Sequence, residues 1–322
     1  MATMNAAIVT SFDEPPHYQQ CEVPQPASSN EILVDILAAG LHPRVRTGAA
    51  AAHYTSTGAL PMIPGIDGVG QRPDGRRIYF IAGDHVPGTM ADKALADMRR
   101  AIELPDGADV TKVAAAMNPA MSSWVALRRR VPLQPGQSVL VLGATGNAGT
   151  MAVQIAKRLG AGRVIGAGRD PGRLHALLSL GADEVVPLTG DAEATTQALG
   201  AAASETDIVI DYLWGRPAQQ AITALLTARS DRSRALDWIQ IGAMAGPAID
   251  LPSAALRSAN LRLQGSGQGS VPAAAYRAEL PSLVHEIDAG TFAVRPTAMP
   301  LAEVEAIWTR PDPPGERTVL VP

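Results

Sequence analysis

Cysteine is nearly absent from this chain of 322 residues, in which Cys21 is the only one. A single cysteine excludes an internal disulfide and any zinc cluster built from thiolates. Charged residues make up 18% of the chain and hydrophobic residues 46%, which is too apolar and too weakly charged for a disordered protein. The chain is therefore expected to fold, and its length suits about two domains.

An excess of positive charge is also missing. The chain has 27 Lys and Arg residues against 31 Asp and Glu residues, a net charge of -4, so neither nucleic acid nor a membrane surface is an expected partner. Glycine, proline or charge interrupts every apolar run well before the ~18 residues that a membrane span needs. Segment 1–16 lacks the basic and apolar regions of a signal peptide. We expect a soluble, cytoplasmic protein.

Short apolar runs broken by proline and glycine fill the first part of the chain, to about residue 120. These runs predict a compact, mostly β domain; they are 6–10, 31–38, Arg77–Ile81 and 101–104. Segment 41–64 has the least regular pattern. Its alanine-rich run, 48–52, is most simply interpreted as a solvent-facing turn of helix.

From about residue 131 the pattern alternates between strands and helices. The predicted strands are Ser138–Leu142, Arg163–Gly168, 184–188, 207–213, 238–243 and Leu261–Gly265. Alternation of this kind predicts an α/β fold, in which six parallel strands form a doubly wound sheet. A further helix (272–288) and strand (318–321) follow, and we expect this tail to return to the first domain. The expected domain limits are 1–122 with 272–322 for one domain, and 123–271 for the other.

A glycine-rich turn follows the first of these strands and opens a helix. In the segment Gly143-Ala-Thr-Gly-Asn-Ala-Gly149, Ala144 stands where the dinucleotide fingerprint has its usual first glycine. Gly146 would let the backbone approach a pyrophosphate, and Gly149 would let the helix lie close to the sheet. The turn predicts a nucleotide site, and its candidate cofactor-binding residues are Thr145, Gly146, Asn147 and Ala148.

The end of the second strand indicates which cofactor is bound. NAD-binding proteins commonly have an acidic residue there, whereas this chain has Gly168-Arg169-Asp170, with Arg173 one helical turn later. Guanidinium groups suit a ribose 2'-phosphate, so Gly168, Arg169 and Arg173 indicate NADPH over NADH. Asp170 could read a 2'-hydroxyl instead, but its position before Pro171 is more simply that of a helix N-cap.

Five further segments, taken with this turn, resemble one known family. They are 64–70 (PGIDGVG), 104–107 (LPDG), 120–127 (AMSSWVAL), 133–140 (LQPGQSVL) and 241–244 (IGAM). In order and spacing the chain resembles a zinc-free medium-chain dehydrogenase/reductase of the NADPH:quinone oxidoreductase branch, to which zeta-crystallin-like proteins belong. The resemblance implies a GroES-like β domain and a Rossmann domain with the cofactor in the cleft. It also implies a homodimer joined by the edge strand Leu261–Gly265.

The chain departs from the metal-dependent members of that family. Those relatives have a Cys early in the first domain and a His-Glu pair after the Pro-Gly dipeptide. This chain has Leu41-His42-Pro-Arg in the first region and Ile66-Asp67 in the second, so of those positions only Asp67 could coordinate zinc. A catalytic zinc needs three protein ligands, so no metal is expected.

The resemblance also implies residues near the nicotinamide. Relatives have a small hydroxyl residue in the segment that matches 120–127, here Ser122, and Asn118 lies one turn earlier. Further candidates for cofactor binding are Leu213 at the end of the fourth strand, and Ile241, Gly242, Ala243 and Met244 after the fifth. For the proton, Tyr54 and His42 are the side-chain candidates and solvent is the alternative, while Tyr54 as a wall of the cleft and a structural His42 stay open.

Three functions fit these features. The first is an NADPH-dependent enzyme that reduces a quinone or the C=C bond of an α,β-unsaturated carbonyl compound. The second is a non-catalytic NADPH-binding sensor or structural protein, because a fold does not fix a function. The third is a metal-free alcohol dehydrogenase. The sequence leaves the acceptor open.

Overall fold

The structure is a computed structural model that describes residues 2–52, 56, 58–83, 87–267, 269–313 and 315–322. Its chain divides into two compact units, of which one comprises residues 1–118 with 273–322 and the other residues 119–272. The boundary at 118/119 falls inside helix α2 (Val110–Val125), which contains Pro119. The domain limits expected from the sequence lie a few residues away and stay a prediction.

The first unit is built on antiparallel β structure. Its larger sheet has the order β14-β15-β3-β4-β5-β7 with β6 also paired to β3, and only β14 and β15 run parallel. A separate hairpin, β1–β2, completes the β structure that is described. The bounds are β1 (Thr3–Ile8), β2 (His17–Glu22), β3 (Glu31–Gly40), β4 (Asp67–Gln71), β5 (Arg77–Ile81), β6 (Lys93–Asp97), β7 (Ala101–Glu103), β14 (Arg295–Pro300) and β15 (Glu316–Val321).

Helices lie beside these strands, and the end of one of them differs from what the sequence predicted. They are α1 (Pro43–Ala49), α8 (Ala273–Asp288) and α9 (Val304–Ile307), with short 3-10 turns at Met98–Arg100 and Leu301–Glu303. The alanine-rich run, expected to be a solvent-facing turn of helix, includes only the end of α1. Ala50, Ala51 and Ala52 follow that helix as exposed residues outside it.

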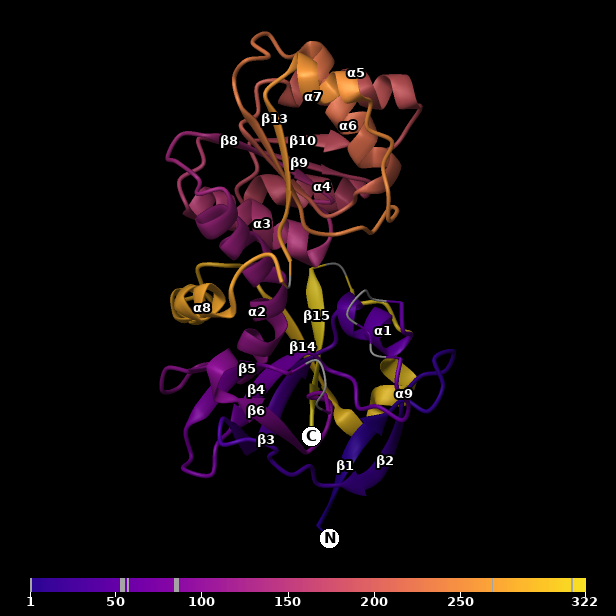
Figure 1. Cartoon of the computed structure of the whole chain (residues 1–322), viewed down its shortest axis with the longest axis vertical. Helices are drawn as coiled ribbons and strands as arrows, with labels where there is room; N and C mark the ends of the chain where they lie inside the picture. Colours follow the sequence, from indigo (N-terminus) through magenta and orange to yellow (C-terminus); the bar gives the residue numbers. More distant parts are fainter. Residues whose placement is uncertain (1, 53–55, 57, 84–86, 268, 314) are drawn as a thin grey trace. The chain divides into compact units, whose positions relative to one another are not determined.

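The second unit is a doubly wound α/β sheet of six parallel strands, which confirms the fold class (Figure 1). The order is β10-β9-β8-β11-β12-β13, so the direction of winding changes between β8 and β11. Helices α3 and α4 lie on one side of this sheet, and α5 and α6 pack together on the other. The strands are β8 (Ser138–Leu142), β9 (Arg163–Gly168), β10 (Glu184–Pro187), β11 (Ile208–Asp211), β12 (Leu236–Gln240) and β13 (Leu261–Gly265).

The helices of this unit follow the strands in turn. They are α3 (Asn147–Arg158), α4 (Pro171–Ser179), α5 (Ala192–Ala203), α6 (Gly215–Ala228) and α7 (Ser253–Ser258), and α2 continues into a π-helical turn at Ala126–Arg130. Apolar side chains of the central strands, such as Leu140, Ile165 and Trp238, are fully buried between the two helix layers. Burial on both faces is why these strands read as continuous apolar runs in the sequence.

Three strands of this sheet have limits other than the expected ones. Strand β10 stops at Pro187, β11 is Ile208–Asp211 and β12 is Leu236–Gln240. The backbone N–H groups of Ile241 and Gly242 both donate to the carbonyl of Asp211, at 2.8 and 3.1 Å, and the chain then leaves the sheet. Residues 241–243 are therefore a loop at the carboxyl edge, where open α/β sheets bind ligands.

No described helix is both long enough and apolar enough to cross a membrane.

Candidate functional site

The glycine-rich turn joins β8 to α3 in a conformation that depends on two glycines. Gly143 has a positive φ of 83°, which glycine adopts without strain. A Cβ on Gly149 would lie 2.2 Å from the carbonyl oxygen of Gly143, so only glycine lets the helix approach the strand this closely. The turn therefore has the shape that the sequence predicted for residues 143–149.

The first turn of α3 leaves backbone donors open. Gly146 is the N-cap, and no side chain caps the helix. Among the described residues, no acceptor is found for the N–H groups of Ala148 and Gly149, while Gly146 is exposed and Thr145 half-buried. Unpaired N–H groups at a helix start, together with the helix dipole, form an anion-binding site.

The end of β9 places positive charge beside this turn. Arg173 donates through Nη1 to the carbonyl of Thr145 at 3.3 Å, which connects α4 to the glycine-rich turn. Asp170 is the N-cap of α4, because its Oδ1 accepts from the N–H of Arg173 at 3.0 Å. Arg169 is exposed, with no polar partner among the described residues, and Gly168 is buried. The Asp170 carboxylate is thus already engaged, whereas the Arg169 guanidinium is available to a ligand.

A buried carboxylate organises the end of β11. Asp211 is fully buried, and its Oδ1 accepts from the N–H groups of Leu213 and Trp214 at 2.8 and 2.9 Å. Its Oδ2 accepts from Nε1 of Trp238 at 3.1 Å. Burial raises the pKa of Asp211, although these three hydrogen bonds act in the opposite direction. The side chain therefore holds the turn 211–214 in a fixed shape.

The predicted residues of the fourth and fifth strand ends come together at this turn. Ala245 donates to the carbonyl of Leu213 at 2.8 Å, and Met244 to that of Tyr212 at 3.3 Å. A Cβ on Gly242 would lie 2.7 Å from the carbonyl oxygen of Tyr212. Leu213 and the loop Ile241, Gly242, Ala243 and Met244 therefore form one connected structure, in which the Met244 side chain is 75% exposed.

Ser122 has a partner that the sequence analysis did not name. Its Oγ donates to the carbonyl of Pro119 at 2.8 Å and lies 2.9 Å from the hydroxyl of Tyr212. Burial raises the pKa of Tyr212 to about 12, so this phenol is protonated and can donate to Ser122. The position of Tyr212 at the carboxyl end of a parallel strand was the available signal. Asn118 is half-buried, four residues before Ser122 on the same helix.

The other unit holds a buried cluster of His42, Asp67 and Tyr79. The Tyr79 hydroxyl donates to Oδ2 of Asp67 at 2.7 Å, and Nε2 of His42 lies 3.3 Å from Oδ1 of Asp67 without hydrogen-bonding geometry. The three side chains are at most 2% exposed. Burial, and then the charge of Asp67, raise the pKa of Tyr79 well above its usual value. The Tyr54 candidate lies outside the described residues.

This cluster does not have the donors that a catalytic zinc requires. Three protein ligands are needed, and nowhere in the described ranges do three His, Cys, Asp or Glu side chains gather. Oδ2 of Asp67 already accepts from Tyr79. Within those ranges, His42 and Asp67 therefore do not form a zinc site with a third ligand.

Known proteins resemble the chain over its whole length. A profile described as zinc-binding dehydrogenase matches residues 148–287. A protein of Emericella nidulans described as "Probable NADPH-dependent quinone reductase" is 30% identical, over 99% of this chain and 100% of its own. The quinone oxidoreductase of Homo sapiens is 33% identical over 51% of each chain. The solved quinone oxidoreductase of Thermus thermophilus, also determined with NADPH, is 24% identical over 99% and 100% of the chains, with a TM-score of 0.79.

A doubly wound nucleotide-binding sheet and an antiparallel β unit together define the class as the medium-chain dehydrogenases/reductases. The full-length relative then identifies the branch. The chain belongs to the NADPH:quinone oxidoreductase-like family.

Proposed function

We propose that this protein is an NADPH-dependent oxidoreductase that reduces a quinone or the C=C bond of an α,β-unsaturated carbonyl compound without a metal. The observation that carries the proposal is the glycine-rich turn, whose open N–H groups at Ala148 and Gly149 suit a pyrophosphate. Membership of the quinone oxidoreductase-like family agrees with it.

The residues around the turn fit NADPH. We assign the diphosphate to the backbone of Thr145, Gly146, Asn147 and Ala148. Arg169, exposed and without a described partner at the end of β9, would hold the ribose 2'-phosphate, and Arg173 would support it from the next helix. The carboxylate of Asp170 caps α4, which leaves it poorly placed to read a 2'-hydroxyl.

The nicotinamide end of the cofactor is assigned to the other residues at the carboxyl edge of the sheet. The backbone of Leu213 and of the loop 241–244 would hold the carboxamide and ribose, with Ser122 and Asn118 on α2. When bound, NADPH supplies a hydride from its nicotinamide ring. The protein holds the ring and excludes water, and Tyr212 keeps the Ser122 hydroxyl in one orientation.

The reduced acceptor also needs a proton. Tyr54, His42 and solvent are the proposed sources. Both ring nitrogens of His42 are buried in the described structure, which favours Tyr54 or solvent. A homodimer is proposed through the edge strand β13, which pairs only with β12 among the described strands. The proposed compartment is the cytoplasm, in keeping with a single free cysteine.

The test is NADPH oxidation at 340 nm by EDTA-treated protein, with quinones, enones and saturated aldehydes as acceptors and NADH in parallel. We expect quinone or enone turnover that is insensitive to EDTA and faster with NADPH. Tight NADPH binding without turnover of any acceptor would contradict the enzymatic proposal and favour a sensor. Oxidation of a secondary alcohol as the dominant reaction would instead identify a metal-free alcohol dehydrogenase.

A further inference from the structure

Asp211 carries a buried charge with no opposite charge beside it. The residue is 0% exposed, and among the described residues no Arg, Lys or His pairs with its carboxylate. By contrast, the buried guanidinium of Arg317 pairs with Asp312 at 2.9 Å. An isolated buried carboxylate is costly because water no longer stabilises its charge, and such groups are common at functional sites.

The donors around this carboxylate explain why the residue is Asp and not Asn. Its two oxygens accept from the N–H groups of Leu213 and Trp214 and from the indole N–H of Trp238. These three groups can only donate, so both oxygens must act as acceptors. An asparagine would turn its own N–H groups toward one of the donors, and a protonated carboxyl group would do the same with its O–H. The three contacts therefore select the charged form of the side chain.

Asp211 is hydrogen-bonded to both backbone segments to which the nicotinamide end of NADPH is assigned. One segment is the turn 211–214, in which its Oδ1 accepts from Leu213 at 2.8 Å. The other is the loop 241–244, whose first two N–H groups donate to the main-chain carbonyl of Asp211 at 2.8 and 3.1 Å. Both segments lie at the carboxyl edge of the same sheet. A nicotinamide ring held by these segments would experience the field of the carboxylate.

Hydride transfer changes the charge of that ring. The acceptor takes a hydride, with its two electrons, from the neutral dihydronicotinamide, and the ring is left with one positive charge. The acceptor then takes a proton from a side chain or from solvent, as described above. A fixed negative charge lowers the free energy of the positive ring, and it acts without reorganisation because five hydrogen bonds already hold Asp211 in place.

We propose that Asp211 is a positioning residue whose negative charge makes bound NADPH a stronger hydride donor. Its carboxylate stabilises the positively charged ring of NADP+ relative to the neutral ring of NADPH. The protein therefore binds NADP+ at least as tightly as NADPH. This inference rests on the proposed function, because it concerns the hydride donor of the same site.

Calorimetric titration with NADP+ and with NADPH tests the proposal in two variants that share one change in the core. W238F removes the indole donor and keeps the carboxylate. D211N/W238F also replaces the carboxylate by a neutral amide, whose N–H groups no longer meet the indole N–H. Relative to NADPH, we expect NADP+ to bind about tenfold more weakly to D211N/W238F than to W238F. If Asp211 were merely structural, both forms would weaken by the same factor, and that result would overturn the proposal.

D237N is the matched control for the loss of one negative charge. Asp237 lies near the amino end of β12 and pairs with Arg262 at 3.8 Å. Because this carboxylate is at the opposite end of the sheet, the ratio of the two dissociation constants should stay within about twofold of the parent value. A tenfold shift in D237N as well would show an effect of net charge and overturn the assignment to Asp211.

The parent protein provides a test that does not depend on the folding of any variant. If it bound NADP+ more than about tenfold more weakly than NADPH, the inference would be overturned. Turnover of quinones or enones with an unchanged ratio in D211N/W238F would overturn the inference and leave the proposed function intact. The expected shift of the ratio without turnover of any acceptor would count against the proposed function alone.

Discussion

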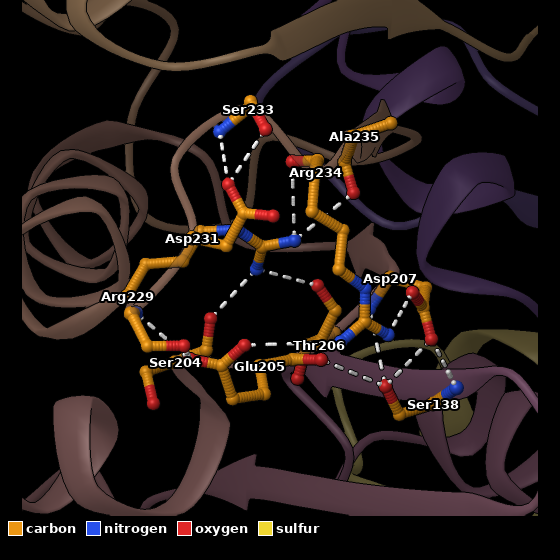
Figure 2. A network of polar contacts seen from close by, with 11 residues as sticks. Ser138, Ser204, Glu205, Thr206, Asp207, Arg229, Asp231, Ser233, Arg234 and Ala235 are labelled. Carbon is orange, nitrogen blue, oxygen red and sulfur yellow. Dashed lines mark hydrogen bonds and ion pairs between the residues drawn. The ribbon is translucent and has the colours of Figure 1, made fainter.

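The two ends of the six-stranded parallel sheet differ in whether their backbone polar groups find hydrogen-bond partners within the chain. At the carboxyl end, the N–H groups of Ala148 and Gly149 in the first turn of α3 have no described acceptor. At the amino end, one arginine closes the loops that enter the strands (Figure 2). Arg229, only 4% exposed, donates to four backbone carbonyls, those of Ser204, Thr206, Arg234 and Ala235, at 2.6, 2.9, 3.3 and 3.0 Å.

The amino end is also closed by side chains on either side of that arginine. Asp207 accepts from the N–H of Ser138 at 2.8 Å and from its hydroxyl at 2.9 Å, which joins the starts of β8 and β11 (Figure 2). Arg234 pairs with the same carboxylate, and Glu205 accepts from the N–H of Ser230 at 2.9 Å. At the amino end, side chains of this chain supply the hydrogen-bond partners of the backbone, which stabilises the fold. At the carboxyl end, backbone donors stay open for a ligand.

The variant G146A gives the sharpest test of ligand binding at the carboxyl end of the sheet. Gly146 has a φ of -80°, and a Cβ there would lie 3.5 Å from its nearest neighbour, so the fold should accept alanine. The methyl group would block the approach of a pyrophosphate. We expect NADPH to bind at least about 100-fold more weakly, or about 3 kcal/mol, with an unchanged melting temperature. Titration of NADPH by calorimetry measures this.

G149A is the matched variant for that experiment. Its Cβ would lie 2.2 Å from a backbone carbonyl, so it should lower the melting temperature as well as abolish binding. Tight NADPH binding by a folded G146A protein would show that the turn is not the phosphate site.

A substitution at the amino end of the sheet should change the stability of the protein and leave the KM for NADPH unchanged. R229M would leave four carbonyls of the strand-entry loops without a donor, and we expect the free energy of unfolding to fall by about 3 kcal/mol, measured by urea denaturation. R229K should recover only part of it, because an ammonium group cannot reach the same four acceptors in a planar fork. The KM for NADPH should not change in either variant. If the KM for NADPH changed while the stability stayed the same, the amino end of the sheet would not have the purely stabilising role assigned to it.

Tyr212, beside the open end, predicts a dependence on alkaline pH. Its pKa is raised from 10.0 to about 12, so the folded state favours the protonated phenol. The associated stability is fully present below pH 10, the unfolded-state pKa, and is lost as the pH rises through about 12. Denaturation curves at pH 9 and pH 12 measure this loss in the parent protein and in Y212F. Between these two pH values, Y212F should lose about 2–3 kcal/mol less stability than the parent protein. An identical loss in both proteins would refute this contribution of Tyr212.

The smallest expected effect concerns the choice of cofactor. R169A removes an exposed guanidinium that has no described partner, so the melting temperature should stay constant. We expect the KM for NADPH to rise about tenfold, roughly 1.4 kcal/mol, while that for NADH stays the same. R163A offers a control, since Arg163 pairs with Glu184 at the amino end of the same strand. Equal KM values for NADPH and NADH in the parent protein would remove the basis of this assignment.

Much of the second unit was predictable because its signals are local. A fully buried parallel strand needs a continuous apolar run, and a phosphate-binding turn needs glycines at fixed spacing. Both patterns can be read within about 10 residues, so β8 and β9 were placed at their observed limits. The N-cap of α4 was predictable for the same reason, since Asp170 acts on an N–H group three residues away.

The parts that could not be predicted depend on residues far apart in the sequence. Ser122 meets Tyr212 across 90 positions, and the end of β12 is set by hydrogen bonds to the carbonyl of Asp211. Strand β14 is paired in parallel with β15, and its sequence, RPTAMP, contains two prolines and lacks an apolar run. In each case a partner distant in sequence supplies the stabilising contact, so no local pattern records it.

The sequence by itself determined the class of fold, the family and the position of the glycine-rich turn, because periodicity and glycine spacing act within one strand, turn or helix. Only the tertiary structure decided that the buried Asp211 carboxylate accepts from the indole of Trp238, that Tyr212 holds Ser122, and that Arg229 closes the opposite end of the sheet. These features arise where separate elements meet, and the free energy that holds them comes from packing and hydrogen bonds between those elements.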